Sequence, residues 1–126
     1  MDVPDDRRYS IDHEWVLATG DRVRVGITDY AQDALGDVVY VELPQVGLEV
    51  RAGESLGEVE STKSVSEIYA PIGGRVTAVN SELADAPERM NSSPYDQGWI
   101  CELDVADQSS IHGLLDAAGY RELTEG

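Results

Sequence analysis

The chain has one cysteine, Cys101, and no phenylalanine among its 126 residues. A single thiol cannot form an intrachain disulfide, which favours a reducing compartment. No apolar run reaches the ~18 residues that a membrane span needs. Residues 1–6 are acidic and include no apolar signal region, so we expect no secretory targeting and a cytoplasmic location.

Histidine is also scarce. His13 and His112 are the only two, and with one cysteine they form no cluster with zinc-binding spacing. No phosphate-binding Gly-x-x-x-x-Gly-Lys or Gly-x-Gly-x-x-Gly sequence is present. Glu60, not serine, stands three residues before Lys63, so the Ser-x-x-Lys nucleophile pair is missing as well. We therefore expect no metal site and no catalysis by this chain alone.

Basic residues are also few compared with acidic ones. Nine basic and 25 acidic residues give a formal net charge of −16, which would repel nucleic acid and anionic membranes and favours partners with basic docking faces. Adaptation to a high-salt host would produce the same excess, and the sequence leaves both explanations open. A length of 126 residues suits one domain, and we expect a monomer.

The first half of the chain alternates apolar and polar residues as β-strands do. Residues 22–27 alternate in this way after a turn at 19–21, which predicts a β-hairpin. Thr28 is suited to cap a short helix over 29–35. Residues 38–43 are rich in β-branched side chains and predict a strand that is partly buried on both faces.

The second half predicts one more strand and a terminal helix. Residues 99–105 alternate so that Cys101 lies on an apolar face, where its thiol is expected to be buried rather than reactive. We expect a loop over 87–94. Apolar residues at helical spacing predict a C-terminal amphipathic helix over about 108–118, interrupted near Gly119. The predicted fold class is mostly β, with a few short helices and this C-terminal helix.

Lysine is as rare as cysteine, and Lys63 is the only one. Its amine can lose a proton and attack an acyl donor, whereas an arginine guanidinium stays protonated. Residues 56–60 and 65–69 both alternate, so we expect a hairpin whose turn, 61–64, holds Lys63 in water. An ordinary solvated turn residue is the alternative, and composition alone favours it.

The residues around Lys63 carry a specific pattern. Residues 60–64 read Glu-Ser-Thr-Lys-Ser, Ser-Glu follows at 66–67, and Ala-Pro-Ile-Gly-Gly stands at 70–74. This pattern resembles the lipoylation hairpin of the glycine cleavage system H-protein family. Asn-Ser-Ser-Pro-Tyr at 91–95 and Gly-Trp-Ile at 98–100 resemble further segments of that family.

Two related families fit less well. Biotin carriers place methionine on both sides of the lysine, where this chain has Thr62 and Ser64. Lipoyl domains of 2-oxoacid dehydrogenases usually have Asp-Lys-Ala around the lysine, where this chain has Thr-Lys-Ser at 62–64. The resemblance to H proteins thus implies a lipoyl/biotinyl-carrier-like barrel-sandwich hybrid of hairpins, with a lipoyl hairpin over about 56–70 in a single carrier domain, 1–126.

The resemblance also implies a cofactor and partners. Lipoate would be attached to Lys63 by a lipoyl-attaching enzyme that recognises the tip residues Glu60, Ser61, Thr62 and Ser64. The arm would carry the aminomethyl group of glycine from a pyridoxal-phosphate glycine decarboxylase to a tetrahydrofolate-dependent aminomethyltransferase, and electrons to a flavin dihydrolipoyl dehydrogenase. Tethering raises the effective concentration of the arm at each partner.

An aminomethyl group on sulfur is lost readily if its nitrogen keeps its lone pair, so a site that keeps the amine protonated would protect it. By analogy with the family, the acidic residues of such a cleft are Asp12, Glu14 and Glu67. The alternative is that these are three ordinary surface carboxylates. Relatives often have histidine at the position of Ala34, so the sequence predicts no imidazole contact from that position.

Three other functions stay open at this point. A relay or scaffold that passes lipoyl groups to other lipoate-dependent enzymes would share the same tip. A purely structural β-barrel adaptor would not need Lys63. A stand-alone enzyme is the least favoured, because it would require turnover by the unmodified chain.

Overall fold

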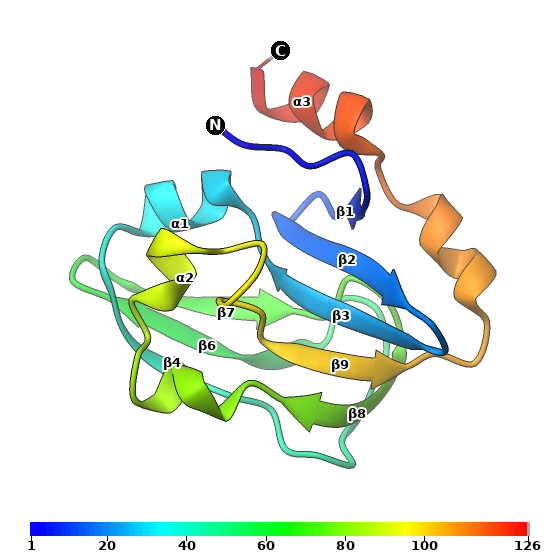
Figure 1. Ribbon diagram of the computed structural model, residues 1–126, viewed down its shortest axis with the longest axis horizontal. Helices are drawn as coiled ribbons and strands as arrows, with labels where there is room; N and C mark the ends of the chain where they lie inside the picture. Colours follow the sequence, from blue (N-terminus) through cyan, green and yellow to red (C-terminus); the bar gives the residue numbers. More distant parts are fainter. Residues whose placement is uncertain (126) are drawn as a thin grey trace.

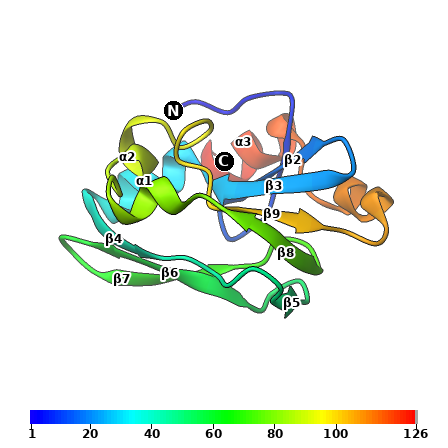
Figure 2. The same cartoon turned by 60° about the horizontal axis from the view of Figure 1, so that its bottom comes forward.

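The computed structural model describes residues 1–125 as two antiparallel β-sheets with short helices (Figure 1). The larger sheet has the strand order β1-β2-β3-β9-β8-β5 and the smaller has the order β4-β6-β7. Figure 2 shows β4, β6 and β7 as one layer below β3, β9 and β8. The strands are β1 (Arg8–Tyr9), β2 (Glu14–Thr19), β3 (Arg22–Ile27), β4 (Val38–Glu42), β5 (Glu49–Val50), β6 (Ser55–Ser61), β7 (Val65–Tyr69), β8 (Gly74–Val79) and β9 (Cys101–Asp104).

The main core lies between the two sheets. Val25 of β3, Val59 of β6 and Leu103 of β9 are all fully buried in it. Each such side chain contributes about 1.5–3 kcal/mol through burial. Cys101 is buried in the same core, and burial raises the pKa of its thiol to about 12. The prediction that Cys101 is buried is therefore confirmed.

Short helices lie around the sheets. They are α1 (Asp29–Leu35), α2 (Arg89–Ser92) and α3 (Ala117–Glu125), with 3-10 helices at Ser81–Ala84 and Gln108–Gly113. Helices α1 and α2 lie at one end of the sheets, and α3 lies over β1 and β2 (Figure 1). The predicted helix over 29–35 is confirmed, and the Thr28 hydroxyl accepts the Ala31 N–H as its N-cap. The mostly β fold class and the presence of a C-terminal helix are also confirmed.

The predicted bounds of the C-terminal helix, 108–118, are wrong. Backbone hydrogen bonds of 2.8 and 2.9 Å join Leu115 to Tyr9, which keeps Leu115 extended and interrupts the helical pattern. The Asp116 side chain then accepts the Gly119 N–H at 2.8 Å. The α-helix therefore begins at Ala117 and runs through Gly119, rather than breaking there.

Two smaller expectations also need correction. The expected loop over 87–94 includes the short helix α2. Strand β4 is buried on one side only, because a register shift between Val38 and Tyr40 leaves Val39 and Tyr40 52% and 55% exposed. β-Branched composition did not reveal this, since a bulge changes which side chains share a face.

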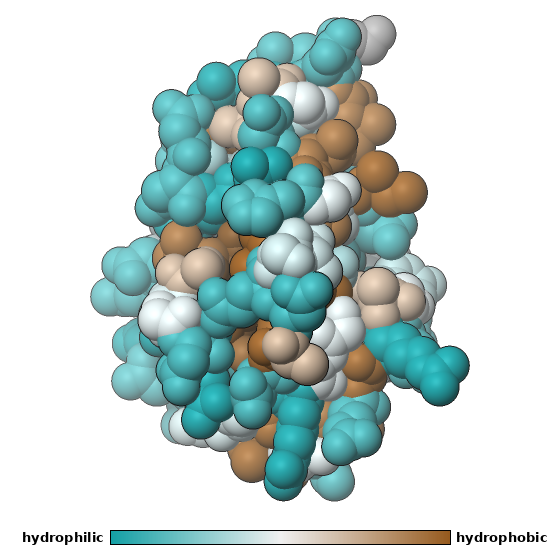
Figure 3. Space-filling model, turned by 90° about the vertical axis from the view of Figure 1, so that its right-hand side faces the viewer, coloured by the Kyte–Doolittle hydropathy of each residue, from teal (hydrophilic) through white to brown (hydrophobic). Residues whose placement is uncertain are grey.

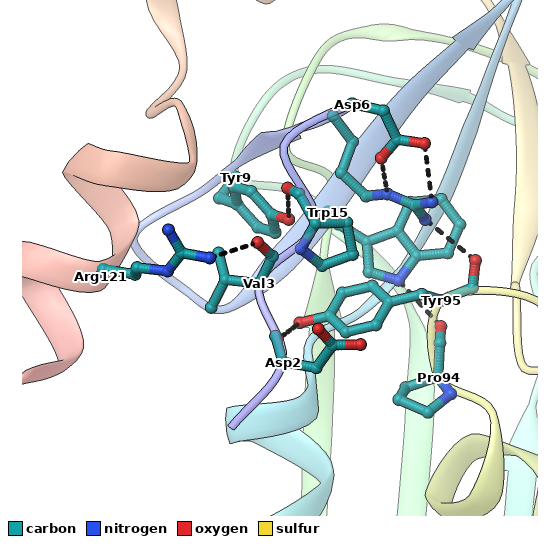
Figure 4. Close-up of polar contacts among 10 residues, drawn as sticks. Asp2, Val3, Asp6, Tyr9, Trp15, Pro94, Tyr95 and Arg121 are labelled. Carbon is teal, nitrogen blue, oxygen red and sulfur yellow. Dashed lines mark hydrogen bonds and ion pairs between the residues drawn. The ribbon is translucent and has the colours of Figure 1, made fainter.

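The N-terminal segment packs on a second, smaller hydrophobic cluster, which contains Tyr9, Trp15 and Tyr120. Figure 4 shows the polar contacts around Tyr9 and Trp15. The Tyr9 hydroxyl donates to the Pro4 carbonyl, and Arg121 of α3 donates to the Val3 carbonyl at 3.0 Å. The Trp15 indole N–H donates to the Pro94 carbonyl at 2.9 Å. These hydrogen bonds join four parts of the chain: its start, β2, α3, and the segment that follows α2.

Figure 3 shows the end of the molecule opposite the β6–β7 turn, where hydrophilic residues cover most of the face and apolar ones lie between them in small groups. This agrees with the net charge of −16. Within residues 1–125, none of the helices has the length and apolar character to cross a membrane.

We predict that Gly57→Ala lowers the free energy of unfolding by about 2–4 kcal/mol. A Cβ at position 57 would lie 2.1 Å from the Glu42 backbone oxygen, so β4 would have to shift. Gly113→Ala is the matched control, because nothing lies within 4 Å of the added carbon. Urea unfolding measures both; equal stability of the two variants would contradict the prediction.

Candidate functional site

The β6–β7 turn places Lys63 at an exposed tip, as predicted. The Ser61 hydroxyl accepts the backbone N–H groups of Lys63 and Ser64 at 3.1 and 3.2 Å and donates to the Ser64 carbonyl. A backbone hydrogen bond of 2.8 Å from Ser61 to Ser64 closes the turn. Ser61 is buried, so it orders the turn from inside, while Glu60, Thr62 and Ser64 are exposed beside Lys63.

The Lys63 side chain lies across Gly36. A Cβ on Gly36 would be 3.2 Å from Lys63 Cε and 3.6 Å from its Nζ. Gly36 has a φ of +81°, which favours glycine. Among residues 1–125, no carboxylate lies within ion-pairing distance of this amine. The lysine amine is therefore accessible and unpaired.

The loop between α1 and β4 holds the tip in place. The Thr62 N–H donates to the Asp37 carbonyl at 3.0 Å. Asn91 fixes this loop from α2, because its amide donates to the Gly36 carbonyl at 2.9 Å and its oxygen accepts the Val38 N–H at 2.8 Å. The segment around Asn91 that resembled the H-protein family thus supports the corner against which Lys63 lies.

A cavity of about 250 Å³ opens beside the turn, between α1, the start of β2 and β7. It brings together the three predicted acidic residues, and Ala34 is part of its wall. Ser64 lines it at the tip end, next to Lys63. The full lining is Asp12, His13, Glu14, Ile27, Tyr30, Ala31, Ala34, Leu35, Val59, Ser64, Ser66, Glu67 and Ile68.

Glu14 is the buried carboxyl of this cavity, with 2% of its surface exposed. Burial raises the pKa of Glu14 to about 7, the Ser10 hydrogen bond opposes the rise, and Asp12 adds to it. The Ser10 hydroxyl donates to Glu14 Oε1 at 2.6 Å. A carboxyl with this pKa changes its charge near neutral pH and gains from a nearby cation.

The other two predicted acids differ from Glu14 because both are exposed. Glu67, on β7, accepts a short hydrogen bond from the Ser55 hydroxyl. Asp12 lies in the turn before β2, where its N–H donates to the Ser10 hydroxyl at 3.3 Å. The cavity therefore combines one buried carboxyl with two hydrated ones on its rim.

His13 is a cavity residue that the sequence did not single out. Its φ of +69° is unusual for a residue other than glycine. Its ring stacks on Tyr30 with centroids 4.5 Å apart, and its Nδ1 lies 2.7 Å from the Tyr120 hydroxyl. Burial lowers the pKa of His13, and Asp12 partly opposes this. The only available signal was its place directly before Glu14.

A larger cavity, about 450 Å³, lies at the edge of β5, β8 and β9. Arg51 and Arg75 line it together with the carboxylates of Glu49, Glu54 and Asp104. No residue of the Lys63 turn borders it. The cavity of about 250 Å³ is the one that lies next to the exposed Lys63 turn and contains the buried carboxyl, so it is the candidate site.

The sequence and structure match one known family. The family model described as Glycine cleavage H-protein matches residues 7–126. A glycine cleavage system H protein from Micrococcus luteus is 57% identical over 124 residues, covering 97% of each chain. One from Thermus thermophilus is 55% identical over 125 residues, covering 99% of this chain and 98% of the relative.

A solved structure agrees with these matches. The crystal structure of a glycine cleavage system H protein from Mycobacterium marinum superposes with a TM-score of 0.89 and 44% sequence identity. The match covers 98% of this chain and all of the other. Fold and sequence therefore point to the same family.

The raised pKa of Glu14 predicts a pH-dependent stability difference. Between about pH 4.5 and 7 the folded state keeps a proton that the unfolded chain releases, so the wild type loses stability as pH rises. Glu14→Gln cannot ionise, and its stability relative to the wild type should increase by about 2 kcal/mol from pH 5 to pH 8.

Urea unfolding of both proteins at several pH values measures this difference. Any constant effect of the glutamine N–H group cancels, because only the change with pH is compared. A stability difference that does not vary between pH 5 and 8 would show that the Glu14 carboxyl is not buried as described.

Proposed function

The chain belongs to the glycine cleavage H-protein family, and from that premise we propose that it is a lipoyl carrier, with lipoate joined to Lys63 as an amide. It carries the aminomethyl group of glycine between enzymes and catalyses no step itself. The observation that supports this most directly is the accessible Lys63 amine on an ordered turn, next to a cavity with a buried carboxyl.

The residues at the tip fit lipoate attachment. Lys63 is exposed and unpaired among the described residues, so an attaching enzyme can reach its amine. The turn is held by the Ser61 hydroxyl and by the Thr62–Asp37 hydrogen bond, so the amine is presented in a defined place. When attached, lipoate supplies a reducible pair of sulfur atoms at the end of a flexible arm.

The cavity fits a cationic cargo. An aminomethyl nitrogen that keeps its proton has no lone pair with which to expel the sulfur. Asp12, Glu14 and Glu67 favour that protonated form through their charge. Glu14 is suited to this task, because an ammonium nearby stabilises its ionised form and offsets the cost of burial. Ala34 provides a small apolar wall and no imidazole.

The proposed partners are a pyridoxal-phosphate glycine decarboxylase, a tetrahydrofolate-dependent aminomethyltransferase, a flavin dihydrolipoyl dehydrogenase and a lipoyl-attaching enzyme. A net charge of −16 favours basic docking faces on these partners and speeds their encounter at low salt. The arm extends from the tip, so each partner must approach the end of the molecule where α1, α2 and the β6–β7 turn lie (Figure 2).

We expect the chain coexpressed with a lipoyl-attaching enzyme to gain the mass of one lipoyl group, and Lys63→Arg to gain none. Arginine keeps the charge and length of the side chain but is not an acyl acceptor. Intact-protein mass spectrometry and peptide mapping over 52–75 measure the modification. An unmodified wild type would contradict the proposal.

Reconstitution of the modified protein with glycine decarboxylase then tests the glycine role. The proposed carrier supports exchange of bicarbonate into the glycine carboxyl group. Lipoylation without such exchange would favour the relay function instead.

Ser61→Ala should lower the kcat/KM of lipoylation by about tenfold, because the turn loses three side-chain hydrogen bonds and presents the amine less well. Ser81→Ala is the control, since Ser81 is exposed in the 3-10 helix Ser81–Ala84. Initial rates of modification at limiting acceptor concentration give the ratio. Equal rates for both variants would remove Ser61 from this role.

A further inference from the structure

The hydroxyl of Tyr120 contacts two residues at the border of the cavity. It lies 2.7 Å from Nδ1 of His13, which lines the cavity ahead of β2. It also lies 2.7 Å from the Thr28 hydroxyl, which caps α1, and the Thr28 N–H donates to the His13 carbonyl at 3.1 Å. Tyr120 belongs to α3 and is fully buried. A residue of the C-terminal helix thus contacts a histidine that lines a site formed by other elements.

The direction of these hydrogen bonds follows from burial. Thr28 is fully buried, and its oxygen accepts the Ala31 N–H at 3.1 Å. Within residues 1–125, the Tyr120 oxygen is the other partner of this hydroxyl. The Thr28 proton must therefore go to the Tyr120 oxygen, because any other arrangement leaves a buried donor unpaired.

The Tyr120 proton must then go to His13. With its oxygen accepting from Thr28, the phenol donates to Nδ1 of His13, which has to be unprotonated. A neutral imidazole with unprotonated Nδ1 carries its proton on Nε2. Among the described residues, no second group hydrogen-bonds to this ring. Nε2, the ring nitrogen without a hydrogen-bond partner among residues 1–125, is therefore an N–H donor.

We infer that Tyr120 is a positioning residue that fixes His13 as an Nε2–H donor for the occupant of the cavity. The inference rests on the proposed function for the identity of that occupant. The carboxylates of Glu14 and Glu67 suit the ammonium of an aminomethyl cargo, and the His13 N–H complements the sulfur to which that cargo is bound. The His13 N–H thus adds a nitrogen donor to the carboxylate acceptors of the cavity.

The first test needs no cofactor. Long-range ¹⁵N–¹H spectra of the unmodified, ¹⁵N-labelled protein report which ring nitrogen of His13 carries the proton, and a His112→Gln variant assigns the two histidines. The wild type should show Nε2–H and unprotonated Nδ1, and Tyr120→Phe should show a mixture of tautomers. A proton on Nδ1 in the wild type, or identical His13 spectra in both proteins, would overturn the inference.

Tyr9→Phe is the matched control. Tyr9 stacks on Tyr120 with centroids 4.7 Å apart, and its hydroxyl donates to the Pro4 carbonyl, away from the cavity. Like Tyr120→Phe, this substitution removes one phenol oxygen from the cluster that contains both tyrosines. It should leave the His13 tautomer as in the wild type. If Tyr9→Phe changes the tautomer as much as Tyr120→Phe does, the effect is general loosening and the inference fails.

The second test uses the lipoylated protein loaded with the aminomethyl group by glycine decarboxylase. Formaldehyde release measures how fast the cargo is lost to water. Tyr120→Phe should lose it about threefold to tenfold faster than Tyr9→Phe, as expected for one weakened hydrogen bond. Equal rates would overturn the inference while leaving the carrier function intact.

A wild type that accepts no lipoyl group would instead contradict the proposed function. In that case the spectra of the unmodified protein still decide the His13–Tyr120 assignment. If Tyr120→Phe does not fold, the wild-type tautomer alone provides the decision, because Nδ1–H would rule out the assigned chain of hydrogen bonds.

Discussion

Burial of the Glu14 carboxyl is the constraint on which the site depends. An ionised carboxylate away from water is costly, and this burial raises its pKa to about 7. The Ser10 hydroxyl compensates only in part, through one hydrogen bond of 2.6 Å. The remaining cost can be offset either by a proton or by a cation in the adjacent cavity. A carrier of an ammonium cargo can use this property, because the empty and the loaded site then favour different charge states of one residue.

The α1 wall of the cavity is held by polar contacts as well as by partly buried Ala31 and Leu35, which pack against the core. Helix α1 has seven residues and none of them is buried, and so short a helix is marginal on its own. Its anchors are the Thr28 cap, Asn91 at the loop that follows it, and the Tyr95 hydroxyl, which accepts the Asp29 N–H at 3.0 Å. The Asn91 and Tyr95 contacts come from a segment that is distant in the sequence. The position of this cavity wall therefore depends on how α2 and the residues after it pack against α1.

The tip combines a stiff base with a flexible side chain. Backbone and Ser61 hydrogen bonds order the turn, whereas the Lys63 side chain extends across Gly36 without an ion pair among residues 1–125. This separation suits a carrier, because a modifying enzyme needs a defined amine and an arm needs freedom to move. Lys63 is also the only lysine of the chain, so no other side-chain amine competes for modification.

Local pattern determined much of this protein from its sequence alone: the mostly β fold, the exposed Lys63 turn, the Thr28-capped helix and the buried Cys101. Each of these depends on neighbours within a few residues, which alternation and capping reveal. Only the tertiary structure decided where the C-terminal helix begins, because a β-bridge between Tyr9 and Leu115 keeps that segment extended. It also decided that Glu14 is buried while Asp12 and Glu67 are not, and that Tyr120 reaches His13 across 107 positions. Burial and such contacts arise when distant segments pack together, and no local pattern records them.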